Sequence, residues 1–332
     1  MPGDSDCTEV RLVNGSTGDP GLFIDYTGKD DALLFDAGEN GSLDSARLGD
    51  LDAVFITHHH VDHFIGLDRI VRANLDRDKA LHIYGPTGTI TKVYDRIKSY
   101  EYPFFPFQKI VLKVHEILEG RIRAAHLECS RRFPKPEIEE KDWQGPLIHE
   151  TQLLRVEAAL VDHTVPCLAF ALVEPEGLEP DPAKIAANGL PKGAWIGRAV
   201  KMQKNGAPID TALTVGGEKR ALGWVLEQAF SNVPGRRIAY VTDTAWSETS
   251  KPGLLRLAHK ARRLYCDSFY AEAQRPQAEK YRHMLAGQAG ELARLAEVEE
   301  LVLIHFSARY EGQYQKLLDE AKAVFPNVRA EF

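Results

Sequence analysis

The segment HHHVDH, His58–His63, holds the densest group of side chains that could do chemistry in this sequence. Neutral imidazoles and carboxylates are good ligands for divalent metals such as zinc. In an irregular loop, His58 and His60 can point the same way, and Asp62 and His63 follow at a turn. These residues suffice for parts of two metal sites, so the segment predicts metal-dependent chemistry.

The elements around this run must position it. The compact apolar run Leu51–Thr57 predicts a buried strand, and Phe64–Leu75 has helical spacing. The run therefore leaves the carboxyl end of a strand, where open α/β architectures place chemistry. That position disfavours a surface histidine run or a tag remnant. His59 lies between His58 and His60 and does not point the same way as they do, so it is not expected to be a ligand.

The same arrangement recurs along the chain, because four predicted strand ends are each followed within a residue or two by a His or Asp. These ends are Thr57, Val161, Thr242 and Ile304. Besides Leu51–Thr57, the predicted strands are Val10–Val13, Gly21–Asp25, Ala32–Asp36, Leu81–Tyr84, Val111–Leu118, Leu153–Val161, Ala169–Glu174, Arg237–Thr242, Arg263–Cys266 and Glu300–Ile304. The other predicted helices are Thr89–Tyr100, Lys251–Lys260, Gln288–Ala296 and Tyr314–Val324.

Two stretches stand outside this pattern. Gly177–Arg237 is rich in Gly, Pro and small residues, and its weak periodicity indicates an insertion or arm rather than core. Arg131–Gln144 is polar and charged and predicts a surface excursion.

Composition sets broad limits on function. The chain has 332 residues, 44% of them apolar and 27% charged, which is ordinary for a globular protein. Its net charge of −7 excludes a wholly basic nucleic-acid coat but not a local basic patch. Four scattered cysteines, no apolar signal segment at the polar start and no long apolar run predict a cytoplasmic protein without a membrane span.

The motifs together resemble a known family. HHHVDH and its preceding strand are similar to the HxHxDH signature of the metallo-β-lactamase superfamily, and Asp36-Ala37-Gly38 resembles its Asp-x-Gly turn. Within the superfamily, the chain is identified as similar to ribonuclease Z, the tRNA 3′-end processing endonuclease. The matches run from about Val10 to Phe325. They include VDHTVP around His163, VTDTAW around Asp243, with Thr242 in place of a Gly, and IHFSARY around His305.

The resemblance implies an α/β fold, an αββα sandwich of two mixed sheets with helices on both outer faces. Residues 1–332 would form one metallo-β-lactamase-type hydrolase domain, with 177–237 as an inserted substrate-binding arm. Two divalent metal ions are implied, with zinc expected and manganese or iron as alternatives. The implied first ligand set is His58, His60 and His163, the second is Asp62, His63 and His305, and Asp243 would bridge the two.

Two catalytic residues are also implied. Asp62 would orient the attacking water, and His283 in YRHMLAGQAG resembles the histidine of the family's Gly-His-Ser segment, which serves the leaving group. Here Arg282 replaces the glycine. Cys266-Asp267-Ser268-Phe269 stands where the family has His-Glu-Ala-Thr, so Asp267 keeps a carboxylate that is one methylene shorter. An ordinary helix-start histidine remains the alternative for His283.

The resemblance makes the arm the tRNA contact. It carries Lys192, Arg198, Lys201, Lys204, Lys219 and Arg220, which suit phosphate contacts or a plain solvated face, and Trp195 could stack on a base or simply pack. We therefore expect a phosphodiesterase that cleaves the 3′ trailer of pre-tRNA, and a homodimer. The alternatives are a hydrolase of a small phosphodiester, ester or lactone that does not act on tRNA, and a non-catalytic scaffold.

Overall fold

The computed structural model describes residues 9–26, 32–151, 154–204, 206–233 and 235–332. Cys7, most of the polar start and Leu153 lie outside these ranges, and so does the side chain of Lys204. The chain divides into two compact units. Unit 1 comprises residues 1–151, 155–172 and 237–332, and unit 2 comprises 152–154 and 173–236.

The first sheet of unit 1 follows the chain order from β1 to β8. Its four central strands, β3 to β6, run parallel, and the outer strands pair antiparallel. The strands are β1 Glu9–Leu12, β2 Leu22–Asp25, β3 Ala32–Phe35, β4 Leu51–Phe55, β5 Leu81–Pro86, β6 Val111–Leu118, β7 Arg121–Glu128 and β8 Glu139–Asp142.

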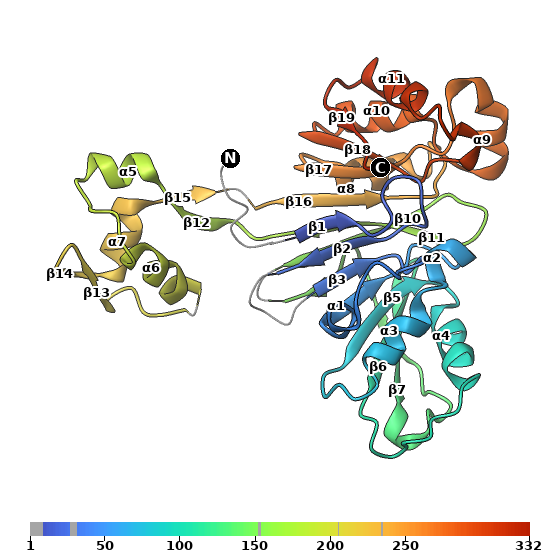
Figure 1. Cartoon of the computed structure of the whole chain (residues 1–332), viewed down its shortest axis with the longest axis horizontal. Helices are drawn as coiled ribbons and strands as arrows, with labels where there is room; N and C mark the ends of the chain where they lie inside the picture. Colours follow the sequence, from blue (N-terminus) through green and yellow to red (C-terminus); the bar gives the residue numbers. More distant parts are fainter. Residues whose placement is uncertain (1–8, 27–31, 152–153, 205, 234) are drawn as a thin grey trace. The chain divides into compact units, whose positions relative to one another are not determined.

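The second sheet has the order β19-β18-β17-β16-β11-β10-β9 (Figure 1). The strands β16 to β19 are parallel, whereas β9 and β10 pair antiparallel. The strands are β9 Leu147–Glu150, β10 Arg155–Val161, β11 Cys167–Val173, β16 Arg237–Val241, β17 Arg263–Asp267, β18 Glu300–Ile304 and β19 Val328–Arg329.

Aromatic side chains fill the space between the two sheets. Phe35 of β3 lies 5.8 Å from Phe170 of β11 and 5.9 Å from Tyr240 of β16, measured between ring centroids. Phe55 of β4 lies 5.7 Å from Phe170. These rings are fully buried, so the two sheets pack face to face as a sandwich.

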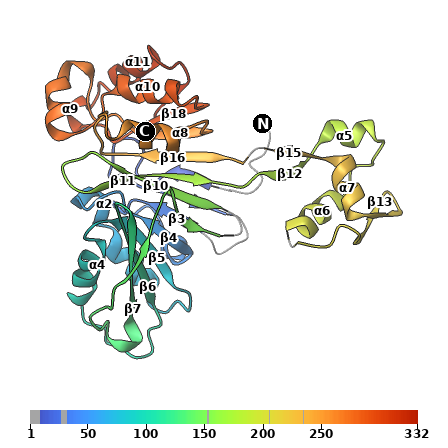
Figure 2. The ribbon, with the colours of Figure 1, turned by 180° about the vertical axis from the view of Figure 1, so that it is seen from behind.

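Helices cover both outer faces of this sandwich (Figures 1 and 2), which confirms the predicted αββα fold. Against the first sheet, Leu67, Ile70 and Val93 belong to one buried cluster with Val54 and Ile83. The helices of this side are α1 Ser45–Gly49, α2 Val61–Phe64, α3 Leu67–Ala73 and α4 Thr89–Lys98.

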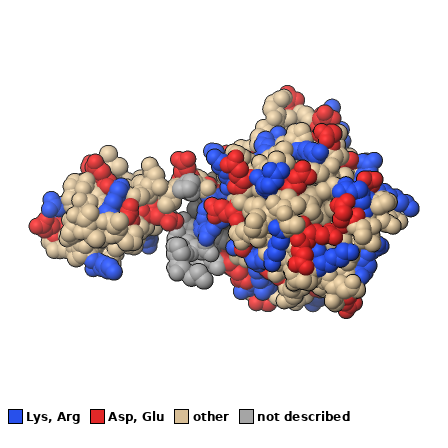
Figure 3. Space-filling model, turned by 90° about the horizontal axis from the view of Figure 1, so that it is seen from above, with Lys and Arg blue, Asp and Glu red and all other residues tan. Residues whose placement is uncertain are grey.

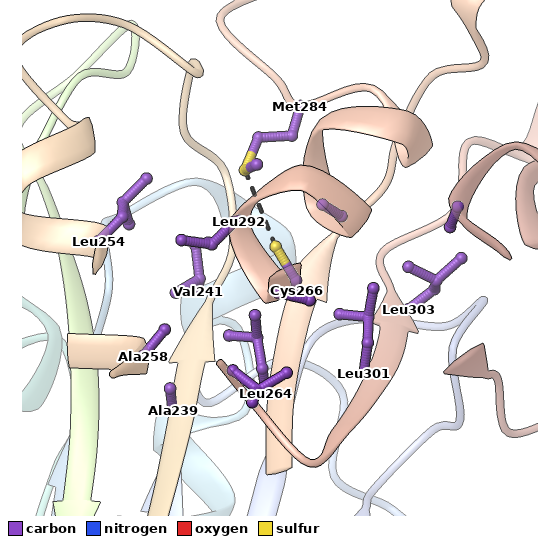
Figure 4. Packing of buried hydrophobic residues seen from close by; sticks show 14 of the residues in the cluster. Ala239, Val241, Leu254, Ala258, Leu264, Cys266, Met284, Leu292, Leu301 and Leu303 are labelled. Carbon is purple, nitrogen blue, oxygen red and sulfur yellow. Dashed lines mark hydrogen bonds between the residues drawn. The ribbon is translucent and has the colours of Figure 1, made fainter. Parts of the chain in front are cut away.

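The second sheet packs its outer face against another set of helices. Leu254, Leu292 and Leu317 share a buried cluster with Val241 and Leu301, part of which Figure 4 shows. Cys266 lies inside it, fully buried, with its thiol 3.8 Å from the sulfur of Met284, so it packs as a small apolar side chain. The helices are α8 Lys251–Ala258, α9 Arg275–Tyr281, α10 Ala286–Leu295 and α11 Gln315–Lys322, with 3₁₀ turns at Glu272–Gln274 and Ala308–Tyr310.

Two expectations for unit 1 need correction. The predicted helix Phe64–Leu75 is two helices, α2 and α3, separated at Gly66. There the chain passes so close to the Asp-x-Gly turn that a Cβ on Gly66 would lie 2.1 Å from the carbonyl oxygen of Gly38. The stretch Arg131–Gln144 is not wholly an excursion, because Glu139–Asp142 pairs with β7 as an edge strand after a 3₁₀ turn at Cys129–Arg131.

Unit 2 is more ordered than its weak periodicity predicted. Its described residues form two antiparallel strand pairs, β12–β15 and β13–β14, and three helices. Trp195 is 3% exposed within its core and donates its indole N–H to Pro191, so this ring packs instead of being presented to a ligand. The elements are β12 Gly177–Pro180, α5 Pro182–Ala187, α6 Trp195–Lys204, β13 Ala212–Val215, β14 Glu218–Ala221, α7 Leu222–Ala229 and β15 Phe230–Val233.

None of the helices in the described part of the chain combines the length and apolar character that crossing a membrane requires.

Candidate dinuclear metal centre

The structure brings all seven expected metal ligands together where strands of both sheets end. The HHHVDH run follows β4, His163 follows β10, Asp243 follows β16 and His305 follows β18. Asp243 and His305 have positive φ angles of 48° and 60°, a left-handed backbone that is unfavourable for residues other than glycine. Such strain is typical of functional sites whose surroundings hold the backbone in place.

The carboxylate of Asp243 lies at the centre of this cluster. Its Oδ2 atom is 3.5 Å from Nε2 of His58 and 3.6 Å from Nε2 of His163. Its Oδ1 atom is 3.5 Å from Nε2 of His63 and 2.8 Å from Nδ1 of His305. One carboxylate oxygen thus faces each of two histidine groups.

The potential ligand atoms form compact groups around it. His58, His60, His163 and Asp243 each offer one atom within 4.8 Å of the others. Asp62, His63 and His305 form a second such group, in which Oδ2 of Asp62 lies 3.6 Å from His63 and 3.4 Å from His305. The described residues contain a third group that shares two of these members: Asp243, Asp267, His283 and His305.

Several ring nitrogens of the cluster are buried without a hydrogen-bond partner. They are Nε2 of His58, His63 and His163. A buried polar atom without a partner costs about 1–3 kcal/mol, so this many in one place indicates that a ligand satisfies them. Burial and neighbouring histidines lower the pKa of His58 to about 2, which keeps its ring neutral, as metal binding requires. The donor set fits divalent metal ions.

A second layer of hydrogen bonds orients these rings. Oδ2 of Asp36 lies 2.9 Å from Nδ1 of His63, and Oδ1 accepts the backbone N–H of Thr57. The Thr57 hydroxyl also lies 3.1 Å from Nδ1 of His58. Tyr240 of the opposite sheet donates its hydroxyl to Asp36 at 3.1 Å. Each imidazole held at Nδ1 presents Nε2 to the centre of the cluster.

His163 is held in the same way by a backbone atom. Its Nδ1 lies 3.1 Å from the carbonyl oxygen of Arg282, and the guanidinium of Arg282 pairs with Asp162, the residue before His163. His59, in contrast, faces the Thr89 hydroxyl at 2.9 Å and the ring of Phe64, and it belongs to none of the ligand groups.

His283 lies beside the cluster and is paired with Asp267. Its Nδ1 lies 3.1 Å from Oδ2 of Asp267, so the shorter carboxylate still reaches the ring. Phe269 stacks on His283 with ring centroids 4.4 Å apart. Burial alone would lower the pKa of His283, but the carboxylates of Asp267 and Asp243 outweigh it and raise the pKa above its usual value. The ring centroid of His283 is 5.3 Å from that of His163.

Residues 31–130 match the family described as the β-lactamase superfamily domain. A ribonuclease Z from Deinococcus radiodurans is 31% identical over 303 residues, which cover 90% of this chain and 89% of that protein. The chain belongs to the ribonuclease Z family. A second ribonuclease Z, from Chlamydia trachomatis, is 30% identical over 306 residues and covers 90% of this chain and 85% of its own.

Solved structures agree with this family at the level of the fold. The short form of human tRNase Z has a TM-score of 0.52 and 18% identity, covering 91% of this chain and 93% of its own. The metallo-β-lactamase fold protein YhfI from Bacillus subtilis has a TM-score of 0.55 and 16% identity, covering 96% and 93%. As a ribonuclease Z family member, the chain is a metal-dependent hydrolase of the metallo-β-lactamase fold.

The sequence did not reveal three of the residues that surround the ligands. Tyr240 looked like one more residue of a buried strand, and only the packed sheets show that its hydroxyl meets Asp36. Phe269 is a single aromatic residue without a periodic signal. Arg282 could have been suspected, because it stands where the family pattern has glycine. Its φ angle of 57° lies in the region that favours glycine.

Proposed function

We propose that the chain is a dinuclear metal-dependent endoribonuclease that removes the 3′ trailer from pre-tRNA. The observation that carries this proposal is the carboxylate of Asp243, which presents one oxygen to each of two ligand groups. Two adjacent divalent ions suit in-line displacement at a phosphodiester better than a single ion does. The relatives named ribonuclease Z support RNA as the substrate.

The proposed metals are two zinc ions. His58, His60 and His163 would hold the first, Asp62, His63 and His305 the second, and Asp243 both. When bound, such ions lower the pKa of a coordinated water and stabilise the charge that develops on phosphate oxygens. Metal analysis of protein purified without added metal tests zinc against manganese and iron.

The chain's own side chains supply the proton transfers. We assign Asp62 to orient the attacking water and take its proton as the new oxygen–phosphorus bond forms. Asp62 is partly exposed at the mouth of the cluster, where a water can reach it. His283, held at Nδ1 by Asp267, donates the proton on Nε2 to the 3′-oxygen as the phosphorus–oxygen bond breaks.

Unit 2 is the proposed tRNA contact. Over residues 173–236 it carries eight Lys and Arg against seven Asp and Glu, so it is nearly neutral in a chain of net charge −7. On the face that Figure 3 shows, basic and acidic side chains are interspersed. Exposed Lys192, Arg198, Lys201 and Lys219 are suited to individual phosphates. Selective contact at a few phosphates is therefore expected here rather than a general basic surface.

A homodimer in the cytoplasm is the proposed working form, on the grounds of the resemblance. Light scattering of the purified chain would report the mass of the assembly.

Cleavage of pre-tRNA beside hydrolysis of bis(p-nitrophenyl) phosphate tests the proposed function. The wild-type protein should cut the RNA directly downstream of the acceptor stem, and Asp62→Ala should abolish both reactions without changing the circular dichroism spectrum. Turnover of the small ester alone would replace this proposal by the small-phosphodiester alternative. Unchanged turnover in Asp62→Ala would remove the assignment of that residue.

A further inference from the structure

A pocket of about 360 Å³ lies beside the ligand cluster, within unit 1. Its walls come from segments that directly adjoin three site residues. Asp162 precedes His163, Ala245–Ser247 follow Asp243 after one residue, and Arg282 precedes His283, which itself lines the pocket. A volume of this size is within the usual range for pockets that take small organic groups. The remaining lining residues are Arg275, Ala278, Glu279, Leu285 and Gln288.

Trp246 gives this pocket an aromatic wall whose orientation is fixed. Its indole N–H donates to Glu291 at 3.2 Å, and the ammonium of Lys251 lies 5.2 Å from the ring centroid. The ring is partly buried against the core of the second sheet and still contributes to the pocket lining. Ordered aromatic rings at the edge of a nucleic-acid site are suited to stacking on a base.

Arg282 gives the pocket a fixed cationic group. Its backbone is held in the left-handed conformation, and its carbonyl oxygen is bound to the ring of His163. Its guanidinium pairs with Asp162, but the side chain remains 47% exposed. A guanidinium has five N–H donors, so donors remain for a sugar or a phosphate oxygen.

We propose that this pocket binds the nucleoside that carries the leaving 3′-oxygen, with its base against Trp246 and its sugar-phosphate beside Arg282. The inference rests on the proposed function, because His283 is assigned there to protonate that oxygen. His283 forms a wall of the pocket, and the nucleoside is attached directly to the oxygen that receives the proton. The pocket is therefore assigned to the base on this side of the cleaved bond and not to the base on the phosphate side.

Single-turnover cleavage of pre-tRNA with abasic nucleotides tests this assignment. One substrate lacks the base on the leaving-oxygen side of the cleaved bond, and another lacks the base on the phosphate side. For the wild-type protein, the first change should slow cleavage about tenfold, as expected for the loss of one stacked base, and the second should not. Trp246→Leu should slow the intact substrate by a similar factor, with no further loss when the leaving-side base is also absent.

Trp246→Phe keeps an aromatic face and should restore most of the rate on the intact substrate. Trp143→Leu is the matched control, because this indole lies in unit 1, is partly exposed, and donates to Leu147 away from the pocket. It should leave the rates on all three substrates unchanged. Unfolding temperature and bound metal, measured for each variant, separate loss of the pocket wall from loss of the fold.

Two results would overturn the inference and leave the proposed function standing. In the first, Trp246→Leu slows cleavage of the intact and the leaving-side abasic substrate by the same factor. In the second, the effect of Trp246→Leu disappears only with the phosphate-side abasic substrate. If Trp246→Leu does not fold, Trp246→Phe is measured in its place. The inference is contradicted if Trp246→Phe cuts the intact substrate as slowly as the wild-type protein cuts the leaving-side abasic substrate. A wild-type protein that cuts no RNA would overturn the proposed function, and the inference with it.

Discussion

Asp36 is the residue on which the second layer of the metal centre depends. It is fully buried, its φ angle is 59°, and its carboxylate contacts His63, Thr57 and Tyr240. A carboxylate of this kind fixes the tautomer of a ligating histidine and raises its basicity. Asp36 would thus act on a bound metal ion through the ring of His63, without being a ligand itself.

Asp36→Asn should weaken binding of one metal ion by about ten- to one-hundredfold, because an amide cannot accept all of these donors. Isothermal titration calorimetry of zinc binding to the metal-free protein measures this change in affinity. Asp52→Asn is the control, since Asp52 pairs with Lys79 outside the ligand cluster. Equal zinc affinities in the two variants would contradict the role given to Asp36.

The unpartnered ring nitrogens lead to a second prediction at this scale. A ligand that binds only the folded state stabilises it by about 4 kcal/mol at a thousandfold excess over its dissociation constant. Removing metal with a chelator should therefore lower the unfolding temperature by several degrees, and adding zinc should restore it. In Asp243→Asn the restored part should be much smaller, because the carboxylate between the two groups is lost. Scanning calorimetry of the wild-type and Asp243→Asn proteins, each without metal and with added zinc, checks this. An equal rise in unfolding temperature in both proteins would contradict a carboxylate shared by the two ions.

At the scale of elements, β5 and β6 carry a second histidine group that is not part of the site. Nδ1 of His82 lies 3.3 Å from Nε2 of His115, and Tyr84 stacks on His115 with centroids 4.4 Å apart. Burial lowers the pKa of His82 to about 4 and that of His115 to about 3. Both rings are therefore neutral in the folded protein at neutral pH.

This arrangement predicts how stability depends on pH. In the unfolded chain these histidines titrate near pH 6.5, so below that pH the unfolded state binds more protons than the folded state. The stabilising effect is complete above pH 6.5 and is lost as the pH falls toward about 4 for His82 and about 3 for His115. His115→Phe keeps the stack on Tyr84 and should make the acid loss shallower by at most about 1.4 kcal/mol per pH unit. Urea midpoints between pH 7.5 and 4.5 measure the difference, and parallel profiles would refute the assignment.

Elements also show how far the sequence could predict this protein. Buried strands such as β4, β16 and β18 are mostly apolar, and the polar residues that follow each strand were visible with them. The edge strand β8 reads EEKD and all four of its residues are exposed, so the sequence shows no alternation of apolar and polar side chains there. The core of unit 2 is collected from short segments, such as Ile185, Leu213 and Val225, whose spacing follows no single helix or strand.

The proximity of the proposed ligands was predictable, because each follows a strand and matches a motif in the expected order. Their supporting contacts were not, since Tyr240 and Asp36 are far apart in sequence and meet only when the two sheets pack. The same holds for Arg282, whose carbonyl oxygen reaches His163 across more than a hundred residues of chain.

At the scale of the whole molecule, residues 173–236 make up nearly all of unit 2. The backbone N–H of Glu174 donates to the carbonyl oxygen of Arg236 at 2.8 Å, so the two ends of this segment lie side by side. All seven proposed ligands and the residues lining the pocket belong to unit 1. Unit 2 has its own buried core around Trp195 and Val225.

Replacing residues 175–235 with a short Gly-Ser turn should therefore leave unit 1 folded. Hydrolysis of bis(p-nitrophenyl) phosphate should persist, whereas cleavage of pre-tRNA should fall by at least about tenfold as phosphate contacts are lost. Kinetic assays of both substrates on the shortened protein check this, with thermal unfolding as the measure of folding. Full RNA cleavage without residues 175–235 would show that unit 2 is not the tRNA contact.

The division of the ligands between the two sheets has a mechanical consequence. His58, His60, Asp62 and His63 come from the first sheet, and His163, Asp243 and His305 from the second. Bound ions would connect the two halves of the sandwich, and His63 and His305, both assigned to the second ion, would close a loop of roughly 240 residues. Neither half could retain the ions alone, so opening of the sandwich and release of metal would be one event. The rate at which a chelator removes the metal would then equal the rate at which the sandwich opens.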